Sequence, residues 1–361
     1  MNHISATAKA DSEFGSRGAY SCGKFVAKTG QTSSSSGTMK NDYLEEDGDD
    51  ITRRHFARLI GGTAAMLLLQ KTGANAQTAA KTSATAALLT RAIPSSGEKI
   101  PVVGLGTSRV FDAGSSAADR QPLEEVLALL VKHGGKLVDT SPMYGRAEAV
   151  TGEIAAKLKL RDSLFLATKV WTTGRDAGIK QMERSLELLG TKKLDLIQVH
   201  NLIDLETQLA TLREWKKAGR IGYTGITHSR TGSQTEVASI LEKEPVDFVQ
   251  INYSLMEREA DERVFPVAKD RGVAVIVNRP FGRGDLFDRA RGKALPDWAA
   301  QIDCKSWAQF FLKWIVANPV VTCAIPATSK PRHMEDNMQA CHGRLPDEKM
   351  RQRMAELVST F

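Results

Sequence analysis

The feature that most constrains the fold of this chain is a regular alternation of short β-rich runs with longer amphipathic stretches from about residue 99 onwards. The eight β-rich runs are 102–107, 136–141, 164–170, 194–200, 221–227, 248–254, 274–280 and 321–327. Stretches with the apolar spacing of helices lie at 122–133, 146–158, 177–189, 205–218, 233–242, 262–271, 306–317, 331–341 and 346–358, and a long loop is expected at 282–305. Strands that alternate with helices predict parallel βαβ units. Eight such units predict a (β/α)8 TIM barrel, because closure leaves no exposed sheet edge.

The composition is typical of a globular protein with a full core. Of the 361 residues, 42% are hydrophobic and 25% are charged, which argues against wholesale disorder, a coiled coil and a polytopic membrane protein. The net charge of +7 comes from scattered basic residues, so no nucleic-acid partner is expected. The four cysteines show no CxxC spacing, and neither a disulfide scaffold nor a metal site is expected.

The first 97 residues lack the barrel pattern. The predicted layout is a disordered N-terminal extension at 1–50, a signal peptide at 51–76, a linker at 77–97 and the barrel domain at 98–361. The extension contains a serine run and an acidic stretch without apolar periodicity, and Met39 is an alternative start of the chain.

The signal peptide is predicted from three features in order. The pair Arg53-Arg54 precedes an apolar stretch at 59–69, and a small-x-small cleavage site follows at 74–76. The apolar stretch is shorter than the about 20 residues of a membrane span, so no stable membrane insertion is expected after cleavage. Paired arginines in this position are typical of a twin-arginine signal. The expected partner is the twin-arginine export machinery, and the expected location is the periplasm or the exterior, or the cytoplasm if the signal is not used.

Polar side chains stand where three consecutive predicted strands end. Asp139 lies near the end of the second β-rich run, Lys169 lies near the end of the third, and His200 ends the fourth. In a TIM barrel the chemistry occurs at the C-terminal ends of the strands. Each residue alone has a structural explanation, but Lys and Asp are rarely buried unless they are paired.

Together with Tyr144, these residues resemble the catalytic tetrad of the aldo/keto reductase family. The spacing Asp-x4-Tyr between Asp139 and Tyr144 matches, and Lys169 and His200 follow on the next two strands. The resemblance covers about residues 99–340, and its supporting stretches are 138–141, 194–200 and 325–329.

The resemblance implies reduction of an aldehyde or ketone by hydride transfer from NAD(P)H. Tyr144 is expected to be the general acid/base, and His200 to orient the carbonyl. A cation beside a phenol favours the phenolate and lowers a pKa that is ordinarily about 10. Lys169 is therefore expected to lower the pKa of Tyr144, with Asp139 holding the lysine in place.

The cofactor is expected to bind across the barrel mouth. The Gly-Leu-Gly at 104–106 continues as Thr-Ser-Arg, so a Rossmann site is not expected. The cofactor-binding positions that the resemblance implies, together with candidates nearby, are Gly106, Thr107, Ser108, Thr227, His228, Gln250, Phe281, Ser329, Lys330, Arg332 and Asn337. Lys330 and Arg332 lie at the start of a predicted helix and are suited to a 2′-phosphate, so NADP is favoured and NAD stays possible.

The sequence departs from the family pattern at the nicotinamide pocket. Thr227-His228 stands where the family often has Ser-Asn. The stretch Asn278-Arg279-Pro280-Phe281 stands where an aromatic side chain commonly stacks on the nicotinamide. Phe281 is expected as a substitute for that aromatic. A non-catalytic, cofactor-sensing binding protein on the same barrel therefore stays open as an alternative function.

The substrate is predicted only as a small carbonyl compound. Met143 and Trp171 flank the expected site and are interpreted as an apolar wall around the substrate, with packing beneath loops as the alternative. A barrel metallohydrolase would need clustered histidine and carboxylate ligands, and the histidines of residues 77–361 do not show that spacing.

Overall fold

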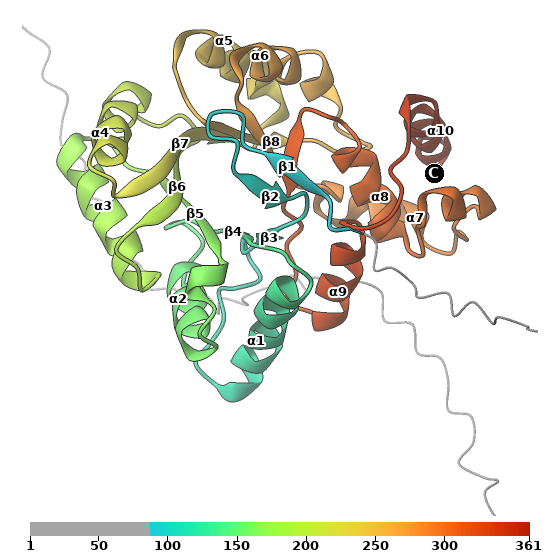
Figure 1. Ribbon diagram of the computed structural model, residues 1–361, viewed down its shortest axis with the longest axis horizontal. Coiled ribbons are helices and arrows are strands. Elements are labelled where there is room, and N and C mark those ends of the chain that lie inside the picture. The colour runs from blue at the N-terminus through green and yellow to red at the C-terminus, as the bar shows by residue number, and fades with distance from the viewer. Residues whose placement is uncertain (1–86) are drawn as a thin grey trace, which may run out of the picture. The chain divides into compact units, whose positions relative to one another are not determined.

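The structure is a computed structural model, and it describes residues 87–361 (Figure 1). The predicted extension at 1–50, the predicted signal peptide at 51–76 and the first ten residues of the predicted linker lie outside the described residues.

Eight parallel strands form one sheet in sequence order from β3 to β10. The strands are β3 (Leu105–Gly106), β4 (Leu137–Asp139), β5 (Phe165–Val170), β6 (Leu194–His200), β7 (Ile221–His228), β8 (Phe248–Asn252), β9 (Ala274–Asn278) and β10 (Val321–Ala324). Parallel bridges from Val103 to Ala324 and from Gly106 to Ala327 join the first strand to the last. The predicted (β/α)8 TIM barrel is confirmed.

Where the first strand meets the last, the two backbones approach each other closely. A Cβ atom added to Gly106 would lie 2.8 Å from the carbonyl oxygen of Ile325. Only glycine fits there without a shift of backbone, so the residue that begins the expected cofactor stretch also allows the barrel to close.

The helices follow the strands around the outside of the barrel (Figure 1). They are α1 (Ala117–Lys132), α2 (Ala147–Lys157), α3 (Arg175–Leu188), α4 (Leu205–Lys217), α5 (Gln234–Lys243), α6 (Val264–Arg271), α7 (Asp285–Ala290), α8 (Trp307–Val316), α9 (Pro331–Gln339) and α10 (Glu348–Ser359). Each predicted helical stretch overlaps one of them. The Ser116 hydroxyl accepts a hydrogen bond from Asp119 N and caps α1, which buries Leu123, Val126 and Leu127 against the sheet.

A hairpin that the sequence analysis did not predict covers one end of the barrel. Strand β1 (Thr90–Ala92) pairs antiparallel with β2 (Lys99–Pro101), and Figure 1 shows the pair lying across the ring of strands. Ile93 and Ile100 of this hairpin pack with Phe165 and Phe248, which begin β5 and β8. The hairpin therefore covers the N-terminal ends of the strands, which we call the base. Strand β1 begins at residue 90, inside the range predicted as a linker, and strands of three residues are too short to show a period of two in the sequence.

The predicted loop at 282–305 also contains regular structure. It holds α7 and 3₁₀ turns at Gly282–Gly284 and Asp297–Ile302. Such short helical pieces do not repeat an apolar spacing often enough to be recognised from a single sequence.

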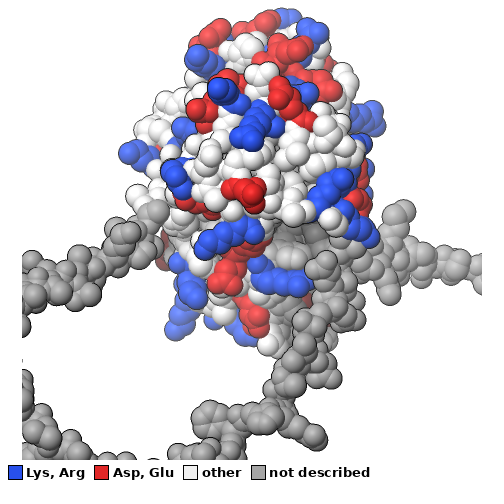
Figure 2. All heavy atoms as spheres, turned by 90° about the vertical axis from the view of Figure 1, so that its right-hand side faces the viewer, with Lys and Arg blue, Asp and Glu red and all other residues white. Residues whose placement is uncertain are grey.

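The charged side chains are interspersed on the face that Figure 2 shows, with acidic and basic groups beside one another. Within residues 87–361, none of the helices has both the length and the apolar character needed to cross a bilayer.

Candidate active site

Four predicted residues meet at the C-terminal ends of the strands, which we call the mouth. Asp139 is the last residue of β4, Lys169 is the last but one of β5, and His200 is the last of β6. Tyr144 lies in the turn between β4 and α2. Parallel neighbouring strands end on the same side, so the three strand residues reach one region.

The contacts among these side chains are close. Lys169 Nζ donates to both carboxylate oxygens of Asp139 at 2.8 Å each, and to the carbonyl oxygen of Thr140 at 2.6 Å. The same nitrogen lies 5.2 Å from the centroid of the Tyr144 ring. The Tyr144 and His200 rings lie 6.1 Å apart, nearly perpendicular. A phenol, an ammonium, a carboxylate and an imidazole thus converge at one mouth.

The ion pair lies inside the protein. Lys169 is fully buried and Asp139 is 2% exposed. Burial by itself lowers the pKa of Lys169, but Asp139 and Tyr144 favour the charged form, and the net direction is upward. Burial raises the pKa of Asp139, while the Lys169 charge and hydrogen bonds from Lys169 and Gln250 oppose that rise. Each charge thus compensates the desolvation of the other.

The expected direction of the Tyr144 pKa is corrected by the structure. Burial of the phenol is the largest influence and raises its pKa, and the Asp139 charge adds to that rise. The Lys169 charge lowers the pKa, as expected, but does not outweigh burial. The phenol is therefore protonated at neutral pH in this structure.

The His200 imidazole is neutral. Burial, followed by the Lys169 charge and His228, lowers its pKa to about 3. Its Nδ1 lies 3.3 Å from the hydroxyl oxygen of Ser141. When that hydroxyl donates to Nδ1, the ring proton is on Nε2, the nitrogen that remains for another partner.

The family is decided by comparison with known proteins. The profile described as the aldo/keto reductase family matches residues 102–357, which is most of the described chain.

The chain belongs to the aldo/keto reductase family.

Relatives of this aldo/keto reductase share low sequence identity with it over most of their length. Aldo-keto reductase YhdN of Bacillus subtilis is 25% identical over 276 residues, covering 64% of this chain and 82% of the relative. Methylglyoxal reductase YeaE of Escherichia coli is 28% identical over 245 residues, covering 66% of this chain and 84% of the relative. Membership makes the chain an NAD(P)-dependent oxidoreductase, as the tetrad predicts.

Solved structures agree on the fold. An aldo-keto reductase from Klebsiella pneumoniae in complex with NADPH is 25% identical, with a TM-score of 0.63 and coverage of 75% of this chain and 95% of that one. The holo form of aldo-keto reductase AKR11C1 from Bacillus halodurans is 22% identical, with a TM-score of 0.62 and coverage of 75% and 96%.

The expected cofactor residues on the first strand have structural roles here. The Thr107 hydroxyl donates to the carbonyl oxygen of Asp139 at 2.9 Å, and Thr107 N donates to the same oxygen at 3.0 Å. Thr107 therefore holds the backbone of Asp139, and its hydroxyl is already engaged. Ser108 follows it at the mouth and is half-buried.

At the end of β7, Thr227 is buried and His228 is engaged in its own loop. His228 Nδ1 accepts from Arg230 N at 3.0 Å, and its Nε2 lies 3.3 Å from the Ser233 hydroxyl oxygen. Both ring nitrogens thus stabilise the turn that follows the strand.

Phe281, expected to stack on the nicotinamide, packs here against aromatic side chains of α7 and α8. Its ring packs with Phe287 at 4.8 Å and with Phe311 at 6.4 Å between centroids, and it is 6% exposed. These partners belong to α7 and α8, so Phe281 is part of the outer core. The sequence could not show this, because the aromatic cluster depends on helix α7.

A group of polar residues surrounds the start of α9. Lys330 N donates to the Thr328 hydroxyl oxygen at 3.0 Å, which shapes the turn before the helix. Ser329 and Lys330 are half-buried, Arg332 is exposed, and Asn337 is buried on the inner side of the helix. Amide N–H groups and cations therefore meet at this helix start, which suits a phosphate group.

The two side chains that are predicted to form an apolar wall lie in loops at the mouth, together with two further exposed apolar side chains. Met143 is 39% exposed and Trp171 is 42% exposed. Within the described part of the chain, the other large hydrophobic side chains of similar exposure are Ile203 and Met256. These four residues follow β4, β5, β6 and β8, so all of them lie in loops at the mouth. An apolar residue a few positions after a predicted strand is the sequence feature by which such residues could have been found.

The backbone is also unusual at the mouth. Asn201, Leu202 and Asp204 after β6, and Arg279 and Arg283 after β9, adopt positive φ angles between 48° and 63°. Residues other than glycine rarely take this conformation, and such residues tend to gather at functional sites.

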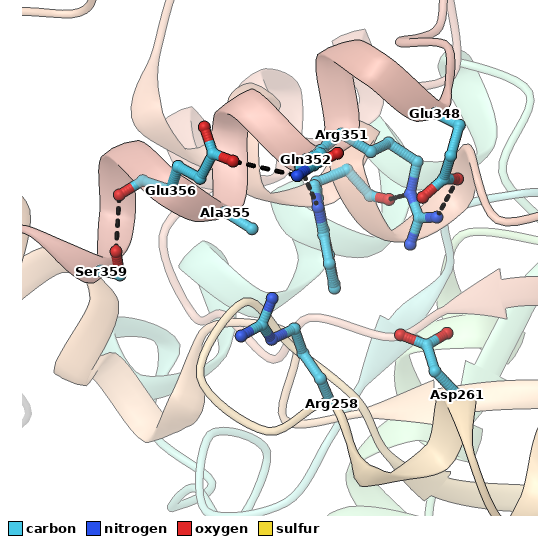
Figure 3. A pocket seen from close by; sticks show the side chains of 9 residues that line it. Arg258, Asp261, Glu348, Arg351, Gln352, Ala355, Glu356 and Ser359 are labelled. Atoms are coloured by element: carbon cyan, nitrogen blue, oxygen red, sulfur yellow. Dashed lines mark hydrogen bonds and ion pairs between the residues drawn. The ribbon is translucent and has the colours of Figure 1, made fainter.

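A hollow of about 340 Å³ lies on the outer side of the barrel between α10 and residues 258–261 (Figure 3). In it Arg351 donates to Glu348 at 2.9 Å and to the carbonyl oxygen of Trp314 at 3.1 Å. Its central charges are thus paired within the protein. Among residues 87–361, no three His, Cys, Asp or Glu side chains cluster so as to hold a metal ion.

Proposed function

We propose that this aldo/keto reductase reduces a small aldehyde or ketone with hydride from NADPH, with Tyr144 as the proton donor. The observation that carries the proposal is the position of Lys169 Nζ, which Asp139 and Thr140 hold 5.2 Å from the centre of the Tyr144 ring. When bound, the nicotinamide supplies the hydride to the carbonyl carbon.

The chain's own residues supply the proton. Tyr144 is protonated at neutral pH because burial raises its pKa, so it can donate to the carbonyl oxygen as negative charge develops there. The phenolate left after transfer gains the attraction of Lys169, which the neutral phenol does not feel to the same extent. Asp139 keeps that lysine fixed, and the neutral His200 is suited to donate from Nε2 to the same carbonyl oxygen.

The residues at the mouth fit a dinucleotide. Gly106 and Ser108, with Thr227 on β7 and Gln250 on β8, would approach the nicotinamide half, and Ser329, Lys330 and Arg332, with Asn337 behind them, would meet the adenosine half. The two cations at the start of α9 favour NADP over NAD, since a 2′-phosphate adds negative charge there. The exposed side chains of Met143 and Trp171 would bound the carbonyl substrate.

The test replaces the phenol with a benzene ring. Tyr144→Phe is expected to lower turnover of NADPH with an aldehyde panel by about 10³-fold, the size of a lost general acid, while NADPH still binds. Turnover is followed at 340 nm and binding by fluorescence titration.

The matched control is Tyr223→Phe. The Tyr223 hydroxyl donates to Glu98 at 2.6 Å beside the β1–β2 hairpin, at the base. This variant is expected to keep the wild-type rate. A Tyr144→Phe protein with full turnover would refute the role of Tyr144, and binding of NADPH without consumption by the wild type would favour the cofactor-sensing alternative.

For the segment at 51–76 we propose export through the twin-arginine machinery to the periplasm or the exterior. The support is the order of Arg53-Arg54, the short apolar stretch and the small-x-small site. Replacing both arginines with lysine is expected to leave the unprocessed chain in the cytoplasm, as cell fractionation would show. Export that persists without the pair would contradict this route.

A further inference from the structure

A buried chain of two amides leads from Asp139 across the barrel interior. Gln250 Nε2 on β8 donates to Asp139 Oδ2 at 3.3 Å, and Gln250 Oε1 accepts from Gln198 Nε2 on β6 at 2.7 Å. Gln198 is fully buried and Gln250 is 2% exposed. Strands β4, β6 and β8 are alternate strands, whose inward side chains share one layer of a TIM barrel.

The direction of this chain follows from Asp139. An ionised carboxylate only accepts hydrogen bonds, so Gln250 turns its NH2 group to it and its carbonyl oxygen away. Gln198 must then turn its own NH2 group to that oxygen. Each amide therefore has one favourable orientation, and Gln198 sets that of Gln250 from the side opposite Asp139.

Strand β7 leaves room for this contact. A Cβ atom added to Gly225 would lie 3.0 Å from Gln198 Cγ and 2.8 Å from the carbonyl oxygen of Phe248. The absence of a side chain at Gly225 lets the Gln198 side chain pass β7 and reach β8.

A glutamine at position 198 costs stability in the core of the barrel. Its Oε1 is buried and has no hydrogen-bond donor among residues 87–361. An unpaired buried acceptor lowers the free energy of unfolding, and an apolar side chain of the same length would avoid that loss. Any advantage of an amide at this position must therefore come from its hydrogen bond to Gln250 Oε1.

We propose that Gln198 is a positioning residue that acts through Gln250. Gln198 holds the Gln250 side-chain amide in one orientation. One N–H of that amide then stabilises the Asp139 carboxylate beside Lys169, and only the second N–H remains to bind a ligand at the mouth. This inference rests on the proposed reductase function. It predicts that a nicotinamide carboxamide is met at Gln250 by a donor and not by an acceptor.

The experiment is a double-mutant cycle with Gln198→Met, Gln250→Met and both together. Gln198→Met is expected to weaken NADPH binding about fivefold and to lower kcat about tenfold, with KM for the aldehyde unchanged. In the Gln250→Met background, Gln198→Met is expected to have no further effect, because its partner is gone. The variants are titrated at a temperature at which each is fully folded, because partial unfolding would itself raise the apparent dissociation constant.

The control is Gln208→Met. Gln208 of α4 is also fully buried, donates to two backbone carbonyl groups and has an unpaired Oε1, but it lies outside the barrel interior. It is expected to lower the melting temperature without changing the affinity for NADPH.

Three outcomes separate the ideas. Additive effects of Gln198→Met and Gln250→Met would overturn the inference, and so would an unchanged NADPH affinity in Gln198→Met. A wild-type protein that oxidises no NADPH with any carbonyl compound would instead overturn the proposed function.

Discussion

At the scale of single residues, burial and the neighbouring charges together set the protonation of the side chains at the mouth. Burial is the largest influence on Asp139, Tyr144, Lys169 and His200, and the charges among them modify it. The neutral His200 is a consequence, because a charged imidazole beside the Lys169 ammonium would be repelled as well as desolvated. In the proposed function, a carbonyl oxygen at this mouth would meet two neutral donors, Tyr144 and His200, with the Lys169 cation behind them.

The depressed His200 pKa predicts a loss of stability in acid. The unfolded chain takes up a proton near the usual imidazole pKa of about 6.5, whereas the folded chain does so only near about 3. Between these values the unfolded state binds more protons, so the free energy of unfolding falls as the pH falls. From pH 7 to pH 4.5 this one group is expected to cost about 2–3 kcal/mol.

The measurement compares urea unfolding of the wild type and His200→Gln at the two pH values. On acidification, the free energy of unfolding of His200→Gln is expected to fall by about 2–3 kcal/mol less than that of the wild type. Tyr144→Phe serves as the control and keeps the wild-type difference, because neither side chain is charged over this range. Equal losses in His200→Gln and wild type would show that His200 titrates normally.

At the scale of elements, the outer helices are held to the barrel by a few specific contacts. Helix α10 illustrates this, since Arg351 donates to the Tyr253 hydroxyl oxygen at 2.7 Å and to the carbonyl oxygen of Trp314, and its guanidinium lies 4.8 Å from the Trp314 ring. The Tyr253 hydroxyl in turn donates to Asp261 at 2.8 Å. One side chain thus links α10 to α8 and to the segment after β8.

Arg351→Met is therefore expected to lower the free energy of unfolding by about 3 kcal/mol, because it removes a buried charge and leaves its partners unpaired. The methionine keeps apolar contact with Trp314. Lys349→Met, an exposed change on the same helix, is expected to stay within about 0.5 kcal/mol of wild type. Urea unfolding measures both, and equal stability of the two variants would show that α10 is held by its apolar face alone.

At the scale of the described barrel, the two ends differ in chemistry. The base is apolar and covered by the β1–β2 hairpin through Ile93 and Ile100, whereas the mouth collects the polar tetrad and the exposed apolar loops. The base thus contributes mainly to stability, and the residues suited to chemistry lie at the opposite end of the barrel.

Ile100→Ala tests this separation. The Ile100 side chain is fully buried against the base, and its truncation is expected to cost about 3 kcal/mol of unfolding free energy. NADPH affinity and turnover per folded molecule are expected to be unchanged. Ile203→Ala at the mouth is the control for stability. It is expected to lower the free energy of unfolding only slightly, because Ile203 is 37% exposed. Weaker NADPH binding in Ile100→Ala would show that the two ends are coupled.

The sequence was sufficient for the ring of strands and for the convergence of Asp139, Lys169 and His200. Eight apolar runs separated by helical stretches leave few ways to bury both faces of a parallel sheet, and parallel strands bring their C-terminal residues to one side. The β1–β2 hairpin was missed because three-residue strands carry no readable period.

What the sequence by itself determined, then, is that Asp139, Lys169 and His200 lie at one end of the barrel, since periodicity and chain order settle that. Only the tertiary structure decided what these residues do there: that burial outweighs Lys169 in raising the Tyr144 pKa, that Phe281 belongs to the outer core, and that Gln198 reaches Gln250 past Gly225. The physical reason is that desolvation and side-chain contacts depend on neighbours brought together from distant parts of the chain, which no local pattern records.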